Sequence, residues 1–339
     1  MKQRPERNEE MDRFLVEHGY EGAVRTMLAG DASFRRYERV THEGRVMVLM
    51  DAPPPWENVS PFIHVTKLLQ ASGASVPEIL ATDENEGFLL LEDLGDGIFT
   101  RLLRDNPALE QEFYLAAIDA LLAIQRTPHP ALPSYDVAVY LRELGLFAEW
   151  FLPQIHGLER AKALREEWLS LWLPIIVNSG LEQSVVVHRD YHADNLLWLP
   201  ERQAHARVGM LDYQDALLGD AAYDLVSLLE DARRGVLPDT VRSCYEYFIA
   251  HSGADASAFA TRYAVLGAQR NAKIIGIFTR LCVRDGKPHY LDYLPRVWGH
   301  FLNDISHPIL TPIRQFVDAY VSPEWRGVFA ANPQIGGWA

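Results

Sequence analysis

Three polar residues have the types and the spacing that phosphoryl transfer from a nucleotide requires: Asp190, Asn195 and Asp212. This reaction needs a carboxylate that accepts the proton of the acceptor hydroxyl, and it needs oxygen ligands for the magnesium ions that neutralise the phosphates. We expect Asp190 to be the catalytic base, and Asn195 and Asp212 to be metal ligands. The expected cofactors are therefore ATP and Mg²⁺.

The residues around these three support this interpretation. His188 to Asp190 followed by Asn195 matches the pattern His-Arg-Asp-x-x-x-x-Asn of kinase catalytic loops. Short apolar runs frame the loop, at residues 185–187, 196–199 and 208–211. The base and the first ligand should thus lie on a loop between short strands, with Asp212 beside them at the end of a returning strand. The alternative is a turn in which Asn195 binds its own backbone.

The composition fits a two-lobed enzyme with a large core, since 339 residues suffice for about two domains and 48% of them are hydrophobic. A net charge of -14 argues against nucleic acid as a partner, because DNA binding uses clustered Lys and Arg. No apolar run approaches the roughly 20 residues of a membrane span, and no apolar signal segment begins the chain. We expect a cytoplasmic monomer that binds small molecules and no membrane.

The hydrophobic patterns predict a β-rich N-terminal part followed by a mostly helical part. In the first 95 residues we expect helices at 12–18 and 57–72 and strands at 24–28, 35–41, 45–50, 76–82 and 88–91. After a hinge at 92–97, we expect helices at 108–124, 137–152 and 159–178, then the catalytic hairpin, then further helices to about residue 320. The predicted fold class is α+β, a bilobal protein-kinase-like fold with an N-lobe at 1–95 and a mostly helical C-lobe at 96–339.

Over nearly its whole length the chain resembles the aminoglycoside-phosphotransferase branch of the kinase-like fold, which also contains choline, homoserine and sugar kinases. Beyond the catalytic loop, the resemblance rests on Leu211-Asp-Tyr213 in place of Asp-Phe-Gly and on the acid-rich helix start at 219–225. In that helix we expect structural roles for Asp220, as a cap, and for Asp224, which the helix dipole favours.

Within this branch, three segments resemble the bacterial anomeric sugar kinases that phosphorylate N-acetylmuramate and N-acetylglucosamine at the 1-position. They are residues 30–37, 49–54 and 269–278. The resemblance implies direct, in-line transfer of the γ-phosphoryl group of ATP to the anomeric hydroxyl of an amino sugar, in the recycling of cell-wall sugars.

The segment at 30–37 lies where a kinase has its glycine-rich phosphate loop. The small residues Gly30, Ala32 and Ser33 would let the backbone approach the phosphates, and Ser33 could add a hydroxyl donor. An ordinary β-turn is the alternative. Two residues of the expected hinge complete the candidate nucleotide site, namely Glu92 and Leu94.

The lysine that usually pairs with the phosphates is missing, because Met50 occupies its place and no predicted N-lobe strand contains a lysine. Another cation must then neutralise the phosphates. We expect Arg35 rather than Arg36, since neighbouring side chains on a strand point to opposite faces and only one can face inward. The missing lysine also leaves open a catalytically silent nucleotide-binding module.

Basic residues of the segment at 269–278 are candidates for binding the acceptor. At about 100° per residue, Arg270 and Lys273 share one arc of a helix with Arg280. Such a face would suit the lactyl carboxylate of N-acetylmuramate. The alternative is a solvated basic face on a surface helix. Asn271 is a candidate for an acetamido group.

His192 and Asp215 flank the catalytic residues, and we expect them to bind acceptor hydroxyls; packing and turn formation are the alternatives. Two other activities also remain open. One is a kinase of aminoglycosides, choline or homoserine, whose cationic substrates an acidic large lobe would suit. The other is a protein kinase, which the short connection between Asp212 and Ala221 disfavours, because it leaves no recognisable activation segment.

Overall fold

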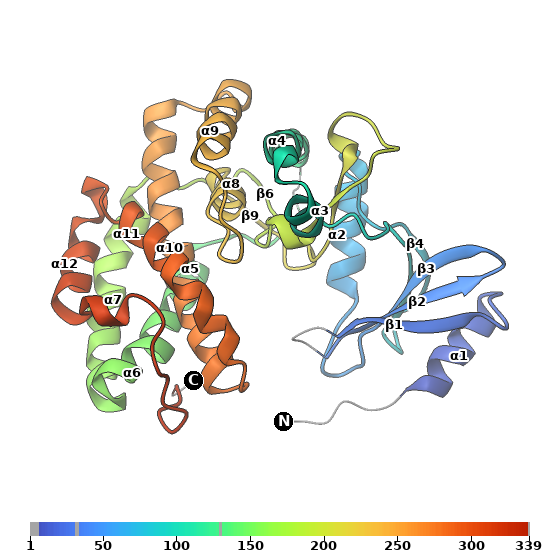
Figure 1. Cartoon of the computed structure of the whole chain (residues 1–339), viewed down its shortest axis with the longest axis horizontal. Coiled ribbons are helices and arrows are strands. Elements are labelled where there is room, and N and C mark those ends of the chain that lie inside the picture. The colour runs from blue at the N-terminus through green and yellow to red at the C-terminus, as the bar shows by residue number, and fades with distance from the viewer. Residues whose placement is uncertain (1–6, 31–33, 129–130, 338–339) are drawn as a thin grey trace.

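The computed structural model of the chain describes residues 7–30, 34–128 and 131–337. A twisted β-sheet lies on one side of the molecule and a larger group of helices on the other (Figure 1). The predicted α+β, bilobal kinase-like architecture is therefore confirmed. The exact boundary between the lobes, expected near residue 95, stays a prediction.

The sheet has five antiparallel strands in the order β1-β2-β3-β5-β4. Their bounds are β1 Val24–Gly30, β2 Arg36–His42, β3 Arg45–Asp51, β4 Ile79–Asp83 and β5 Phe88–Glu92. The residues of β5 are buried on both faces, because two helices cover the sheet. Phe88 and Leu90 pack in one cluster with α1 (Asn8–Glu17), whereas Leu89 and Leu91 pack in the other with α2 (Ser60–Ala71). This division follows from the two-residue period of a strand.

The remainder of the described chain is mostly helical. Its α-helices are α3 Phe99–Asp105, α4 Glu110–Gln125, α5 Val137–Leu146, α6 Leu152–His156, α7 Leu158–Asn178, α8 Ala222–Leu229, α9 Pro238–Ser252, α10 Ala256–Val283, α11 Leu294–Asp304 and α12 Thr311–Tyr320. The long helix α10 packs against α5, α8 and α11, and the indole rings of Trp168, Trp172 and Trp298 are buried in the core. Within the described ranges, no helix has both the length and the apolar character that crossing a bilayer requires.

Several elements differ from the predictions. The helix expected at 12–18 spans Asn8–Glu17, and the strand expected at 76–82 spans Ile79–Asp83. The helix expected at 57–72 begins only at Ser60, whose backbone N–H donates to the side chain of Asn58 at 2.9 Å. The helix α3 was missed, because seven residues are too few to show a clear helical period. The helix expected at 137–152 is interrupted by the π-helical turn η2, Phe147–Phe151, before α6 begins.

Two short antiparallel strand pairs between α7 and α8 carry the catalytic motif, and the second of them is a hairpin. Strand β6 (Val185–Val187) pairs with β9 (Leu217–Gly219), and β7 (Leu196–Trp198) pairs with β8 (Val208–Met210).

The β7–β8 hairpin is tied to the hinge by one backbone hydrogen bond and to the N-lobe by another. Trp198 donates its N–H to the carbonyl of Gly97 at 2.7 Å, and Met210 donates to Ser75 at 2.8 Å. A Cβ at position 97 would approach the Trp198 carbonyl to 2.6 Å, so only glycine allows this contact. The hairpin is thus fixed beside the hinge.

Candidate active site

The antiparallel pairing of β7 with β8 brings the two predicted metal ligands together. Leu196 pairs with Met210, so the residues just outside this pair, Asn195 and Leu211, also lie side by side. Leu211 donates its N–H to the carbonyl of Asn195 at 2.9 Å. Asp212 follows at once, in a left-handed conformation with φ of 59°, and its Oδ1 accepts from Gln214 Nε2 at 2.7 Å.

Asp190 follows β6 by three residues and is held by its backbone. Its carbonyl oxygen accepts from Asn195 Nδ2 at 3.0 Å and from the His192 N–H at 3.1 Å. Burial acts to raise the pKa of Asp190, but nearby positive charge, above all that of Lys273, holds it below its ordinary value. Asp190 is therefore ionised at neutral pH, as a general base must be.

The catalytic loop begins with a backbone conformation that is unfavourable for a residue with a side chain, since Arg189 has φ of 77°. Asp224 of α8 supports it. Its two carboxylate oxygens accept from the N–H groups of His188, at 2.6 Å, and Arg189, at 2.9 Å. Burial raises the pKa of Asp224 to about 7 in spite of these bonds. Asp220 Oδ1 accepts from the Ala222 N–H at 2.9 Å, but Ala221 and not Asp220 occupies the N-cap position of α8.

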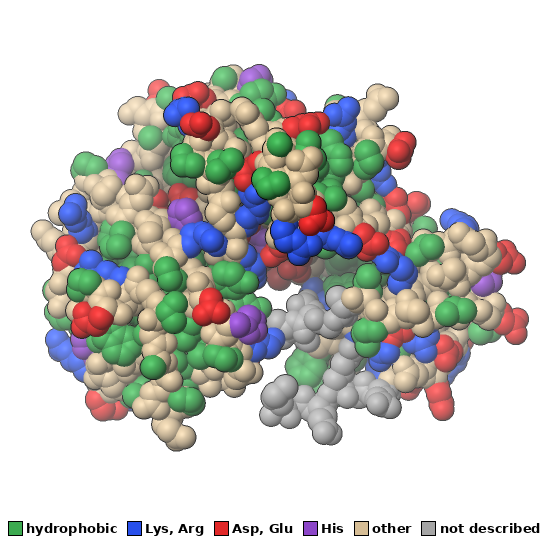
Figure 2. All heavy atoms as spheres, viewed as in Figure 1, with side chains coloured by type: hydrophobic (Ala, Val, Ile, Leu, Met, Phe, Trp, Pro, Cys, Tyr) green, Lys and Arg blue, Asp and Glu red, His purple; other side chains and the backbone are tan. Residues whose placement is uncertain are grey.

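A cleft of about 510 Å³ lies between the hinge and the β7–β8 hairpin. Glu92 and Leu94 of the hinge line it together with Asn195 and Asp212, and apolar side chains form most of the remaining wall, among them Val48, Phe62, Leu91, Ile98, Leu197 and Leu211. Such a lining suits a flat, largely apolar base, with the metal ligands at one end. In the space-filling view the molecule is hollowed between its two parts, and charged side chains gather beside the hollow (Figure 2).

The residues at that end of the cleft fit a magnesium ion. Because Asn195 uses its Nδ2 to bind the Asp190 carbonyl, its Oδ1 is directed the other way. Asp212 adds carboxylate oxygens at the same cleft wall. Hard oxygen donors of these two kinds are what Mg²⁺ takes from proteins.

The structure separates the two candidate phosphate-binding arginines. Arg35 Nε lies 3.2 Å from Glu57 Oε2, and the Phe34 N–H donates to Glu57 Oε1 at 3.1 Å. Burial acts to lower the pKa of Arg35, but Tyr37, Glu57 and Asp212 raise it above its ordinary value. Arg36 instead forms an ion pair with Glu38.

The rest of the expected phosphate loop is only partly described. Gly30 ends β1 and pairs with Arg36 of β2. Ala32 and Ser33 lie outside the described residues. Met50, at the position of the usual lysine, is buried in the sheet.

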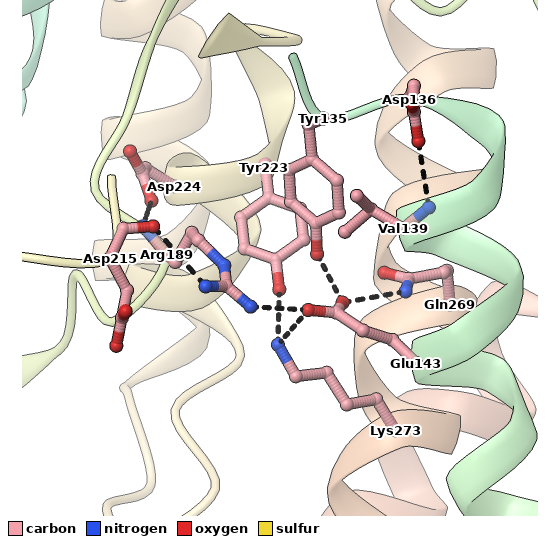
Figure 3. A network of polar contacts seen from close by, with 10 residues as sticks. All are labelled: Tyr135, Asp136, Val139, Glu143, Arg189, Asp215, Tyr223, Asp224, Gln269 and Lys273. Carbon is pink, nitrogen blue, oxygen red and sulfur yellow. Dashed lines mark hydrogen bonds and ion pairs between the residues drawn. The ribbon is translucent and has the colours of Figure 1, made fainter. Parts of the chain in front are cut away.

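Among the predicted sugar-binding residues, Lys273 has partners inside the protein. Its Nζ lies 2.9 Å from Glu143 Oε1 and 3.3 Å from the Tyr223 hydroxyl (Figure 3). Arg270 is only 5% exposed, and its Nη1 has no hydrogen-bond partner among the described residues. The alternative of a solvated basic face is therefore wrong for these two residues.

The other three candidates lie in different settings. His192 is buried with its Nε2 3.1 Å from Arg233 Nη1, and burial lowers its pKa. The carboxylate of Asp215 is exposed, while its carbonyl accepts from Arg189 Nη1 at 3.3 Å. Asn271 is fully buried, and its Nδ2 donates to Glu230, at 2.7 Å, and Asp304, at 3.0 Å.

A family model described as "Phosphotransferase enzyme family" matches residues 25–258, which is more than half of the chain. The chain belongs to this family. Two relatives named "N-acetylmuramate/N-acetylglucosamine kinase" extend the match to most of the chain. The one from Caulobacter vibrioides is 38% identical, over 92% of this chain and 96% of the relative. The one from Pseudomonas aeruginosa is 41% identical, over 80% of this chain and 81% of the relative.

A solved structure of a spectinomycin phosphotransferase, in complex with ADP and spectinomycin, has a similar fold. The TM-score is 0.58 at 15% identity, over 94% of this chain and 100% of that one. At this identity the likeness concerns the fold alone. The family match and the two relatives show that the protein is an enzyme of the kinase type, as the resemblance implied.

Sequence reasoning missed two residues of the phosphotransferase that support its active site. Glu57 stands beside Arg35, and Glu143 lies at the centre of the contacts in Figure 3. Glu143 did leave a signal, since it is a single carboxylate between Tyr140 and Phe147 on the apolar side of a predicted helix.

Proposed function

We propose that this phosphotransferase transfers the γ-phosphoryl group of ATP to the anomeric hydroxyl of an amino sugar, N-acetylmuramate or N-acetylglucosamine. The observation that supports it most is that the oxygen ligands Asn195 and Asp212 line one cleft together with the hinge. The ionised Asp190 is joined to Asn195 through its backbone carbonyl. The names of relatives that are 37% to 41% identical supply the class of acceptor.

In this proposal Asp190 orients the anomeric hydroxyl and takes its proton as the new O–P bond forms and ADP leaves. Asn195 Oδ1 and the Asp212 carboxylate would hold Mg²⁺. When bound, the ion supplies positive charge that offsets the charge of the phosphates. Positioning and charge stabilisation account for the chemistry, so no covalent phosphoenzyme is needed.

Arg35 replaces the missing strand lysine. The ion pair with Glu57 fixes its guanidinium, just as a lysine and a glutamate pair in protein kinases. The raised pKa of Arg35, to which Tyr37, Glu57 and Asp212 contribute against the effect of burial, supports a position beside the phosphates. The backbone near Gly30, Ala32 and Ser33 would cover them.

The charge around the base favours an anionic or neutral acceptor over a cationic one. Lys273 and Arg270 both act on the pKa of Asp190, so their charges lie close to the place where the hydroxyl must sit. Of the two, Arg270 has an unused Nη1 that can pair with the lactyl carboxylate of N-acetylmuramate. Asp215 and His192 are the proposed partners of the sugar hydroxyls, and the buried Asn271 is left out.

We also propose that the enzyme is a cytoplasmic monomer whose partners are ATP and the sugar. We predict that the enzyme binds neither nucleic acid nor membranes. The first part rests on the net charge of -14, and the second on the lack of a long apolar run in the sequence. Light scattering after size exclusion at micromolar concentration tests the monomer directly.

The test of the function is ATP turnover with Mg²⁺ against N-acetylmuramate, N-acetylglucosamine, kanamycin and choline, with Asp190→Asn as the blank. Phosphorus NMR locates the product phosphate. An anomeric phosphate formed only from the amino sugars, and lost in Asp190→Asn, supports the proposal. Measurable ATP binding without turnover of any acceptor would instead favour the silent nucleotide-binding module.

A second variant tests the role of Arg270. Arg270→Met should lower kcat/KM for N-acetylmuramate at least tenfold while changing kcat/KM for the uncharged N-acetylglucosamine much less. An equal loss with both sugars would show that Arg270 does not recognise the carboxylate.

A further inference from the structure

Glu143 of α5 lies at the centre of a polar network next to the catalytic loop (Figure 3). Its Oε1 accepts from Arg189 Nη2 at 2.5 Å and from Lys273 Nζ at 2.9 Å. Its Oε2 accepts from Gln269 Nε2 at 3.1 Å and from the Tyr135 hydroxyl. Four side chains from three separate parts of the chain thus meet on one carboxylate.

This carboxylate is ionised although only 5% of the residue is exposed. Burial acts to raise the pKa of Glu143, but Lys273 and Arg189 outweigh it and lower the pKa to about 2. Burial likewise acts to lower the pKa of Lys273, and Glu143 holds it above its ordinary value. Removing the carboxylate would leave two buried positive charges without their counter-charge, which is strongly unfavourable.

The network acts on the residue that immediately precedes the base. Arg189 has φ of 77°, and a conformation of this kind persists only where the surroundings determine it. Its N–H is held by Asp224 at 2.9 Å, and its guanidinium spans from Glu143 to the carbonyl of Asp215. The ring of Tyr135 lies 5.7 Å from the same guanidinium. The side chain of Arg189 therefore fixes the backbone from which Asp190 projects.

Helix α10 supplies the other side of the network. Gln269 and Lys273 are four residues apart, so they lie on the same face of the helix, and both reach Glu143. One turn further on, Gly276 allows α10 to touch the end of α5. A Cβ there would overlap the backbone of Leu146 and lie 2.6 Å from the Phe147 nitrogen. This close contact sets the spacing at which Lys273 meets Glu143.

We propose that Glu143 is a positioning residue for phosphoryl transfer: by holding Arg189, its carboxylate sets the orientation of Asp190. Glu143 itself does not line the nucleotide cleft, whose lining residues come from elsewhere in the described chain. Its effect should therefore fall on the catalytic step and not on nucleotide binding. The kinetic part of this inference rests on the proposed function.

The first test is Glu143→Gln, which keeps the size of the side chain and removes its charge. With N-acetylglucosamine as the acceptor, we expect kcat to fall at least tenfold, while the Kd of ADP with Mg²⁺ stays within about twofold of the native value. Glu143→Asp, which keeps the charge, should recover part of the lost kcat. A native kcat in Glu143→Gln would overturn the proposal.

Glu149→Gln is the matched control. Glu149 lies in the adjoining turn η2 and pairs with Arg165 at 3.1 Å, away from the catalytic loop. This variant also loses a partly buried ion pair, so it reports the general cost of such a loss. Its kcat should stay within about twofold of native. An equal fall of kcat in both variants would count against a specific role of Glu143.

Hydrogen–deuterium exchange of the loop at 188–195 gives a readout that needs no acceptor. Glu143→Gln should speed exchange there, and Glu149→Gln should not. If the native protein phosphorylates neither amino sugar, the proposed function fails, but exchange still decides the inference, and unchanged protection of the loop would overturn it. Should Glu143→Gln not fold, Arg189→Met replaces it, because methionine cannot pair with the carboxylate: a native kcat in that variant would show that the contact is not required.

Discussion

Asn195 Nδ2 lies 3.0 Å from the backbone carbonyl oxygen of Asp190. This hydrogen bond joins the proposed metal ligand Asn195 directly to the backbone of the proposed base Asp190, five positions earlier in the same loop. It also sets the amide of Asn195 so that its oxygen is directed away from the loop. The position of the base and that of the metal ion are therefore not independent in this site.

Replacing Asp190 by Asn should remove the proton acceptor and leave the loop backbone intact. We expect kcat to fall by about 10²- to 10⁴-fold, the usual contribution of a general base, with little change in the Kd of ADP. Steady-state kinetics and calorimetric titration measure the two effects. Asp194→Asn is the control, because Asp194 is a neighbouring, partly exposed residue that contacts Arg233 at 3.7 Å. A variant Asp190→Asn with more than a tenth of native kcat would exclude Asp190 as the base.

Arg35→Met should weaken ATP binding, because it removes the positive charge held by Glu57 beside the metal site. A hydrogen bond to a charged group contributes about 1.5 to 3 kcal/mol, so we expect KM for ATP to rise by roughly 10- to 100-fold. Arg36→Met is the matched control, since Arg36 is paired with Glu38, and its KM should change by less than about threefold. The opposite ranking of the two variants would assign the phosphate contact to Arg36.

The ionised Glu143 makes stability depend on pH. Folding lowers its pKa from 4.5 to about 2, so its carboxylate stabilises the folded state above pH 4.5, and this stabilisation is lost as the pH falls toward 2. A shift of this size corresponds to about 3 kcal/mol. Urea titrations of the native protein and Glu143→Gln should therefore differ by about that free energy of unfolding at neutral pH, and by progressively less below pH 4.5.

The raised pKa of Asp224, about 7, does not disturb this comparison. A carboxyl whose pKa rises on folding stabilises the protein at low pH and loses that contribution as the pH rises through 7. Because Asp224 is present in both proteins, its effect cancels in the difference. A gap between the two variants that is constant from pH 7 to pH 3.5 would contradict the assignment of the charge to Glu143.

Gly276→Ala should destabilise the protein even though alanine favours a helix. The added methyl group would meet the backbone of Leu146 and Phe147, which cannot move aside as a side chain can. Overpacking of this kind costs about 1 to 3 kcal/mol. Gly299→Ala in α11 is the control, since a methyl group there meets nothing within 4 Å. Thermal unfolding should show a lower Tm for the first variant and an unchanged or higher Tm for the second.

The arrangement of Asp190, Asn195 and Asp212 was predictable because it depends on local structure. Short apolar runs around the motif predicted short strands, and the antiparallel pairing of two such strands brings the residues at their ends together. That Arg35 and Arg36 reach different partners was predictable for a similar reason, since side chains of neighbouring residues diverge. The choice of Arg35 as the phosphate-binding residue stays a prediction.

The role of Glu143 was not predictable, because its partners lie far away in the sequence. Helical periodicity places Arg270 and Lys273 on one side of α10, but it does not say what faces them. The structure shows that Lys273 meets a carboxylate 130 residues away. The helical pattern suggested that Lys273 belongs to an open basic face that binds the sugar. The structure instead places Lys273 in the network beside the catalytic loop.

The contact between Arg189 and Glu143 has a consequence for regulation. In protein kinases, a phosphate added to the activation loop orders that loop by pairing with arginine side chains. Here the arginine of the catalytic loop already has an anionic partner, encoded in the same chain and ionised at every physiological pH. The enzyme should therefore be switched on by folding alone. We expect its rate in the cell to follow the concentrations of ATP and acceptor, without any signal from a second kinase.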